Sequence, residues 1–322
     1  MSNYATRPLD FTGLKTVGLE ERGGKVKTAD FASPYRKGSG LAAWVDSLPH
    51  ILAGDSFRAV VDAVAAARAK KRPILWALGG HVIKCGLAPV LADLMRRGYA
   101  TAFAMNGAAA IHDFEIALAG HTSEDVEAAL PDGRFGAAEE TGREMNRAIA
   151  EGDAAGLGMG EALGRRLCQG PAAGGQGPGT CSLLLQAYQA GIPVTVHVAI
   201  GTDTPHTHPA ADGAAIGSAS HRDFRLFCAL VADLNGGGAY LNVGSAVVLP
   251  EVFLKAVSAV RNLGRPLTDF ATANFDFLQH YRPRLNVVER PHARSGGAGY
   301  AITGHHELMI PLLAAALIER DS

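Results

Sequence analysis

Titratable side chains gather in a few glycine-containing turns of this 322-residue chain. Each turn follows a short apolar run and carries groups that can move a proton, bind a metal ion or hold an anion. In chain order these residues are His81, Lys84 and Cys85; Asn106, His112, Asp113 and Glu115; Asp203, His206, His208 and Asp212; Ser245 and Glu251; and His305, His306 and Glu307. Soluble domains seldom place so many polar groups after strands without using them, so the pattern indicates one functional edge.

Proton transfer is the chemistry that these turns suggest first. An imidazole titrates near neutral pH, and a lysine can form an imine if burial lowers its pKa. The candidate catalytic residues are His81, Lys84, His112, His208 and His305.

The segments between the turns alternate in character. Apolar runs at 73–80, 99–107, 192–203 and 239–244 predict buried parallel strands, and 285–291 (LNVVERP) predicts a late strand. Amphipathic segments lie between them, which predicts an α/β fold with a doubly wound, mostly parallel, Rossmann-like sheet. Ligands bind such sheets at the carboxyl ends of the strands, so the turns should meet there.

The chain divides into an arm and a body. Residues 1–50 are polar and weakly periodic with basic patches, which predicts an N-terminal arm that wraps the body or a neighbouring subunit. Residues 51–322 show no linker or repeat and are expected to form a single α/β domain.

The composition limits which binding partners and which cellular compartment we expect. A formal net charge of -1 gives no electrostatic footprint for nucleic acid or an acidic membrane. No apolar run reaches the roughly 18–20 residues that a membrane span needs, and the first residues lack the apolar core of a secretory signal. A cytoplasmic protein is therefore expected, with its four cysteines as free thiols.

Glycine-rich turns offer candidate phosphate sites. No GxGxxG occurs in the Rossmann position and no Walker sequence occurs. The turns at 79–81 (GGH), which contains Gly80, and 106–108 (NGA) are better placed, because backbone amides at helix N-termini bind phosphate. These glycines are equally compatible with sharp turns alone.

A metal site is the alternative chemistry. Asp203, His206 and His208 could supply a ligand set, with Asp212 nearby. The flanking Pro205 and Pro209 indicate a loop, and ordinary loop histidines hydrogen-bonded to neighbours are the favoured reading. Lys84 and Cys85 near a helix start suggest an activated thiol, although buried packing is more common there.

Taken in order, the turns resemble those of deoxyhypusine synthase. The segment NGAAAIHDFEIALAG is similar to the nucleotide-binding turn of that family, on which Asn106, Gly107 and Ala108 fall, with Asp113 on its second acid. Asp212 and Gly213 fall on the family's Asp-Gly, and GHHELMIPLLAAAL is similar to its C-terminal helix. The resemblance implies a Rossmann-like fold, NAD as cofactor at these residues, and a homo-oligomer, either tetramer or dimer.

Departures from the family argue against deoxyhypusine synthesis itself. The family's Trp-Gly-Lys sequence is absent, Ser218 replaces an acid that holds the polyamine, and His305 stands near the position of another acid. Because a polyamine needs carboxylates, we expect instead an NAD-dependent enzyme acting on a small polar amine or amino acid. A metal-dependent hydrolase or lyase and a non-catalytic ligand-binding protein are the alternatives.

Overall fold

Six parallel strands form one sheet in the computed structural model, which describes residues 3–174 and 176–321. The strands are β1 (Ile74–Leu78), β2 (Ala102–Asn106), β3 (Val194–His197), β4 (Ala239–Val243), β5 (Ala271–Asp276) and β6 (Ala298–Thr303). Their order is β3-β2-β1-β4-β5-β6, and Trp76 lies opposite Phe103 on one side and Leu241 on the other. This is the Rossmann order, in which the sheet grows in opposite directions from a switch point between β1 and β4. The predicted doubly wound parallel sheet is confirmed.

Helices cover both faces of the sheet, as the alternation of buried side chains requires. On β1, Trp76 and Leu78 belong to one core cluster, whereas Leu75 and Ala77 belong to the other. The first cluster includes residues of α2 (Leu52–Ala69), α4 (Ala88–Arg96), α5 (Gly107–Ala119), α8 (Met159–Gln169), α9 (Leu183–Gln189) and α13 (His306–Ile318). The second includes residues of α10 (Gly213–Ala232) and α11 (Val248–Asn262). The remaining α-helices are α1 (Gly40–Asp46), α3 (Gly80–Lys84), α6 (Val126–Ala129), α7 (Glu139–Ala154) and α12 (Tyr281–Pro283).

Side-chain caps start the two long helices that follow β2 and β3. Asn106 Oδ1 accepts a hydrogen bond from the Ala109 amide, and Asp212 Oδ1 accepts from the amides of Ala214 and Ala215. A capping side chain satisfies amides that have no partner within the helix, so both polar residues have a structural role here.

The region from 265 to 303 departs from the sequence-based expectation. Residues 285–291 do not form a strand, because Arg284–Glu289 is a π-helical segment bounded by Pro283 and followed by Pro291. The strands are instead β5, ATANFD, and β6, AGYAIT, whose alanine, glycine and asparagine residues have low β propensity. Their backbones are held by pairing with β4 and with each other, which local sequence does not reveal.

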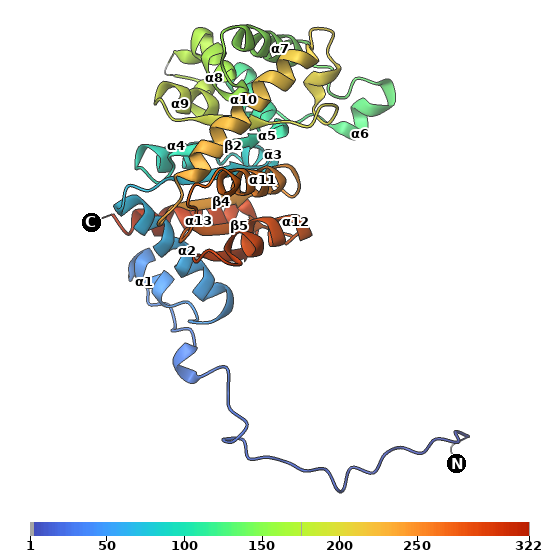
Figure 1. Ribbon diagram of the computed structural model, residues 1–322, viewed down its shortest axis with the longest axis vertical. Coiled ribbons are helices and arrows are strands. Elements are labelled where there is room, and N and C mark those ends of the chain that lie inside the picture. Colours follow the sequence, from blue (N-terminus) through green and yellow to red (C-terminus); the bar gives the residue numbers. More distant parts are fainter. Residues whose placement is uncertain (1–2, 175, 322) are drawn as a thin grey trace.

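The N-terminal segment extends away from the body (Figure 1). It has one short 3₁₀ turn, Thr28–Asp30, and its large apolar side chains, among them Leu9, Phe11 and Leu14, are exposed. Contact with the core begins at α1, where Val45 is buried. No helix among the described residues combines the length and apolar character that crossing a membrane requires.

The turns after β1 and β4 cross at van der Waals contact. The Gly79 amide donates to the Val243 carbonyl at 2.9 Å, and a Cβ on Gly79 would lie 1.9 Å from the Gly244 carbonyl oxygen. We predict that Gly79→Ala lowers the free energy of unfolding by about 1–3 kcal/mol, because one backbone must move. Denaturant titration measures this change.

The matched control is Gly217→Ala in α10, where a Cβ would meet nothing within 4 Å. Alanine there should stabilise the helix by about 0.5–1 kcal/mol. Equal effects of the two substitutions would contradict the crossing as a steric constraint.

Candidate functional site

The carboxyl ends of all six strands meet at one edge, because the strands are parallel. Two groups of side chains lie there. The imidazole cluster comprises His81, Cys85, Phe277, His305, His306 and Glu307, from the ends of β1, β5 and β6. The α5 cluster comprises Asn106, Gly107, His112 and Asp203, near the ends of β2 and β3.

Glycines bring the backbone close together between the two groups. Gly244 has φ +67 in the turn after β4, a conformation that favours glycine. A Cβ on Gly80 would lie 2.9 Å from the Ala108 methyl group, so α3 approaches the start of α5 closely. At the switch point backbone therefore packs closely without large side chains between the turns, and Gly79 and Gly80 are buried.

A row of amide side chains lines the ends of β4 and β5. Asn242 Nδ2 donates to Asn274 Oδ1 at 2.7 Å, and Asn274 Nδ2 donates to Gln279 Oε1 at 2.8 Å. Asn242 Oδ1 is buried and has no hydrogen-bond partner among the described residues. An unsatisfied buried acceptor is costly, so this oxygen is a free hydrogen-bonding position within the amide row.

His306 lies buried beneath the imidazole cluster. Its Nε2 is 3.1 Å from the Phe275 carbonyl oxygen, which can only accept, so Nε2 carries the proton. Burial lowers the pKa of His306, which favours the neutral ring. Nδ1 is then an acceptor, and it has no partner among the described residues.

Above His306 the other rings gather around Phe277. The His81 ring centroid lies 5.5 Å from that of His306 and 6.1 Å from that of Phe277. The His305 ring stacks on Phe277 at 6.0 Å with an interplanar angle of 11°, and its Nδ1 is 3.7 Å from Glu307 Oε1. His305 is thus exposed, whereas the adjacent His306 is buried.

The surroundings of Cys85 do not favour its thiolate form. Burial raises the pKa of the Cys85 thiol, and the Glu307 carboxylate raises it further. Lys84 has the opposite but smaller influence. Because the thiolate is the nucleophile, the hypothesis of a Lys84–Cys85 activated pair is not supported by this environment.

Asp203 fills the space above the start of α5. A Cβ on Gly107 would lie 1.9 Å from Asp203 Oδ2, so only glycine permits this approach. Asp203 Oδ2 is buried without a partner among the described residues, and burial raises the pKa of this carboxyl. A carboxylate therefore lies at the carboxyl end of β2, although it is supplied by the loop after β3.

His112 lies beside Gly80 and is held by a chain of polar groups. Its Nδ1 is 2.7 Å from Thr122 Oγ1, which donates to Glu115. Burial lowers the pKa of His112 and outweighs the nearby Glu115 carboxylate, which raises it, while Lys84 lowers it slightly further. The ring is therefore oriented and neutral near pH 7, while Lys84 is exposed.

Asp113 is not placed at a ligand site. It is fully buried, and its carboxylate accepts from Ser182 Oγ at 2.6 Å and from the amides of Leu183 and Leu184. Burial raises its pKa to about 6. These bonds join α5 to the start of α9, so the expected cofactor contact is corrected to a structural one.

The histidines after β3 do not converge on a metal ligand set. His206 Nδ1 accepts from the Gly201 amide, whereas His208 Nε2 lies 3.1 Å from Glu139 on α7. His208 packs against Gly142, where a Cβ would meet its ring at 2.4 Å. The geometry thus does not assemble Asp203, His206 and His208 as ligands, and it places His208 away from the imidazole cluster. Asp212 caps α10 and Gly213 begins that helix.

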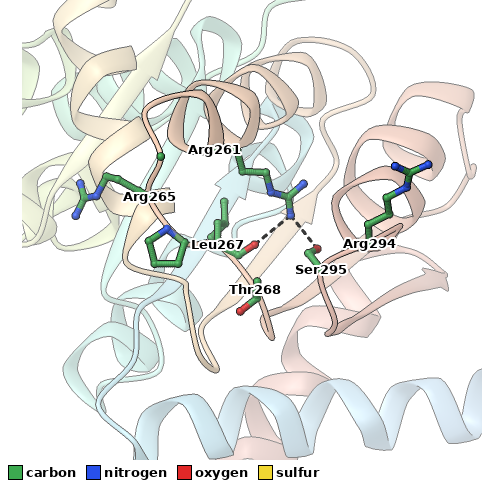
Figure 2. Close-up of a pocket in the computed structure, with 8 residues that line it drawn as sticks. Arg261, Arg265, Leu267, Thr268, Arg294 and Ser295 are labelled. Carbon is green, nitrogen blue, oxygen red and sulfur yellow. Dashed lines mark hydrogen bonds between the residues drawn. The ribbon is translucent and has the colours of Figure 1, made fainter.

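A cavity of about 440 Å³ lies at the opposite edge, near the amino ends of β5 and β6 (Figure 2). Arg261, Arg265 and Arg294 surround it, but the Arg261 guanidinium already donates to Leu267, Pro291 and Ser295. Figure 2 shows Arg265 and Arg294 extending apart from each other. The cavity therefore lacks the convergent polar groups found at the carboxyl edge.

The sequence reasoning missed the amide row and the role of Phe277. Asn242 and Asn274 are register partners inside strands that are otherwise apolar. A polar residue in the middle of a buried strand is unusual. The asparagines in the segments 241–243 (LNV) and 273–275 (ANF) were therefore a signal that the sequence contained. Phe277 follows β5, a strand that the sequence did not predict.

Comparisons with solved structures show the fold. A conserved putative LOR/SDH protein from Methanococcus maripaludis S2 is 15% identical over 89% of this chain and 72% of that chain, with a TM-score of 0.50. AgrE, solved as a ternary complex with ornithine and NAD+, is 16% identical with a TM-score of 0.50, and the chain spans 34% of its length. No family model and no curated protein sequence matches the chain.

A putative deoxyhypusine synthase from Entamoeba histolytica is also among the similar structures, 12% identical over 90% of this chain and 96% of that chain, with a TM-score of 0.48. Identities this low concern the fold alone. The chain therefore has the doubly wound α/β fold of the LOR/SDH protein and AgrE.

Proposed function

We propose that this protein is an NAD-dependent enzyme that oxidises a small amine or amino acid at the carboxyl edge of its sheet. The observation that carries the proposal is the switch point of a 3-2-1-4-5-6 sheet, where glycines let the turns after β1 and β4 pack directly against each other. AgrE, which shares the fold, has been solved with ornithine and NAD+.

Residues on either side of the switch point suit the two halves of the dinucleotide. In Rossmann folds a carboxylate near the end of β2 accepts hydrogen bonds from the adenosine ribose. Here β2 ends in Asn106, and the unpartnered Asp203 Oδ2 beside Gly107 supplies the carboxylate. On the other side, Asn242 Oδ1 can accept from the carboxamide of the nicotinamide.

The imidazole cluster supplies the groups for proton transfer. NAD+, when bound, accepts a hydride from the carbon that bears the amine. His305 is the best placed of the five candidate catalytic residues to take the accompanying proton, because its ring is exposed and stacked on Phe277. Glu307, 3.7 Å from its Nδ1, stabilises the imidazolium that results.

Carboxylates at this edge favour a cationic substrate. Glu307 is exposed beside His305, and Asp276 Oδ1 lies 3.9 Å from His306 Nε2. Such carboxylates stabilise a bound primary ammonium group, whereas they do not stabilise a substrate whose only charged group is a carboxylate. The number of acids is small, which is in keeping with a compact amine or amino acid rather than a polyamine.

The proposal is tested with purified protein, NAD+ and a panel of amino acids and short amines. We expect NAD+ to raise the melting temperature and one of the amines to drive NADH formation, read as absorbance. His305→Gln should lower that rate by about 10²–10⁴-fold while leaving NAD+ binding unchanged, because it removes the proton acceptor. His208→Gln is the control and should keep the full rate. If NAD+ neither binds nor is reduced, the proposal is wrong, and a ligand-binding protein without catalysis becomes the better description.

Asp203 should select NAD+ over NADP+. A buried carboxylate at the adenosine ribose repels the 2′-phosphate of NADP+. We predict that Asp203→Asn weakens NAD+ binding and reduces the preference for NAD+ over NADP+, as measured by calorimetric titration of both nucleotides. A preference unchanged by Asp203→Asn would show that this carboxylate does not contact the ribose.

The exposed arm motivates the proposal of a homo-oligomer. Apolar side chains such as Leu9, Phe11 and Leu14 are 81%, 71% and 65% exposed, and burial against another subunit would remove them from water. We predict that replacing these three residues by serine in the full chain lowers the molar mass measured by light scattering. A mass unchanged from that of the unmodified oligomer would exclude this role of the arm.

A further inference from the structure

We infer that His81, Cys85 and Glu307 form a binding site for a divalent transition-metal ion of the zinc type. The inference goes beyond the proposed NAD chemistry and does not depend on it. Within residues 3–174 and 176–321, these are the three metal-ligating side chains whose ligand atoms lie within 4.8 Å of one another.

Two of the ligands come from one turn of helix. His81 lies in α3 and Cys85 ends it, and the Cys85 amide donates to the His81 carbonyl at 2.9 Å. Residues four apart lie on the same face of a helix, so both side chains point to the same side. Glu307 comes from the first turn of α13, more than two hundred residues later in the chain.

The spacing of the atoms suits tetrahedral coordination. Cys85 Sγ lies 3.7 Å from Glu307 Oε2. With a metal–sulfur bond of about 2.3 Å and a metal–oxygen bond of about 2.0 Å, a tetrahedral site has a sulfur–oxygen separation of about 3.5 Å. A small movement of side chains at this edge, where His81 and Glu307 are exposed, would complete the site.

The donor set selects the metal. A thiolate and an imidazole favour Zn²⁺ over Mg²⁺ or Ca²⁺, which prefer oxygen ligands. Three protein ligands leave the fourth position open, as in catalytic zinc sites. That position can take water or the carboxylate or amine of a small ligand at the carboxyl edge.

Neighbouring groups hold the ligands in place. His305 Nδ1 is 3.7 Å from Glu307 Oε1, the oxygen that does not face Cys85. The His81 ring packs against both Phe277 and the buried His306. A group that hydrogen-bonds to a metal ligand orients it and raises affinity, and His305 is the neighbour placed nearest to Glu307 for this role.

Titration of the full chain with Co²⁺ tests the inference, because Co²⁺ reports its ligands in the visible and near-ultraviolet spectrum. We expect one equivalent to bind, with a thiolate-to-cobalt charge-transfer band and d–d bands of tetrahedral intensity. Zn²⁺ should displace Co²⁺ and remove both. Cys85→Ser should remove the charge-transfer band, and Glu307→Gln and His81→Gln should each weaken binding.

Cys181→Ser is the matched control, because Cys181 is an exposed free cysteine away from this site, and it should leave the spectrum unchanged. His305→Gln should weaken Co²⁺ binding by about 10–100-fold and keep the band, as loss of an orienting partner does. Circular dichroism establishes that each variant is folded. Absence of a charge-transfer band in the unmodified protein, or its retention in Cys85→Ser, would overturn the inference. Since the readout is a cobalt spectrum without nucleotide, its failure is distinct from failure of NAD+ binding.

Discussion

The close crossing of the turns after β1 and β4 is the constraint on which the carboxyl edge depends. Strand order reverses at this point, so the chain leaves β1 toward one side of the sheet and leaves β4 toward the other. Gly79 and Gly244 let the two turns touch without side chains between them. The amide row begins at Asn242 in β4, just before one of these turns, and the first residues of α3 follow the other.

Buried carboxylates join helices and strands elsewhere in the molecule to the elements that form this edge. Asp113 accepts three hydrogen bonds from the start of α9, and Asp223 in α10 accepts from the amides of Val196 and Gly160. Burial raises the pKa of Asp223 to about 7. Both acids occupy positions where amides point at them, so they substitute for the anions that bind at helix N-termini elsewhere. Asp113, which the sequence placed among the ligand-site acids, is therefore internal, as is Asp223, whereas Asp203 keeps a buried oxygen that has no partner among the described residues.

The strand–turn–helix alternation was readable from the sequence up to β4, because those strands are continuous apolar runs such as ILWAL. It failed between residues 265 and 303, where β5 and β6 depend on pairing and the β-branched run around Val287 and Val288 lies in a π-helical segment, whereas the C-terminal helix was expected and is present. The candidate residues at the edge were readable in part. His81 was expected from the turn after β1 and His305 from the segment before the last helix, whereas the proximity of His81 to Glu307 and of Asp203 to Gly107 depends on how distant loops fold over the edge.

The imidazole cluster and the α5 cluster impose opposite electrostatic demands on one ligand edge. Near α5, the helix N-terminus favours negative charge, yet Asp203 already occupies the space above Gly107, so a hydroxyl-bearing group fits there better than a phosphate. Near β6, Glu307 with His305 and His81 favours a cation, either an ammonium group or a metal ion. The glycine crossing lies between the two clusters, and the Gly79 and Gly244 amides there already donate to Val243 and Phe275. The same crossing that closes the sheet at its switch point therefore keeps the acidic group near α5 apart from the imidazole cluster near β6.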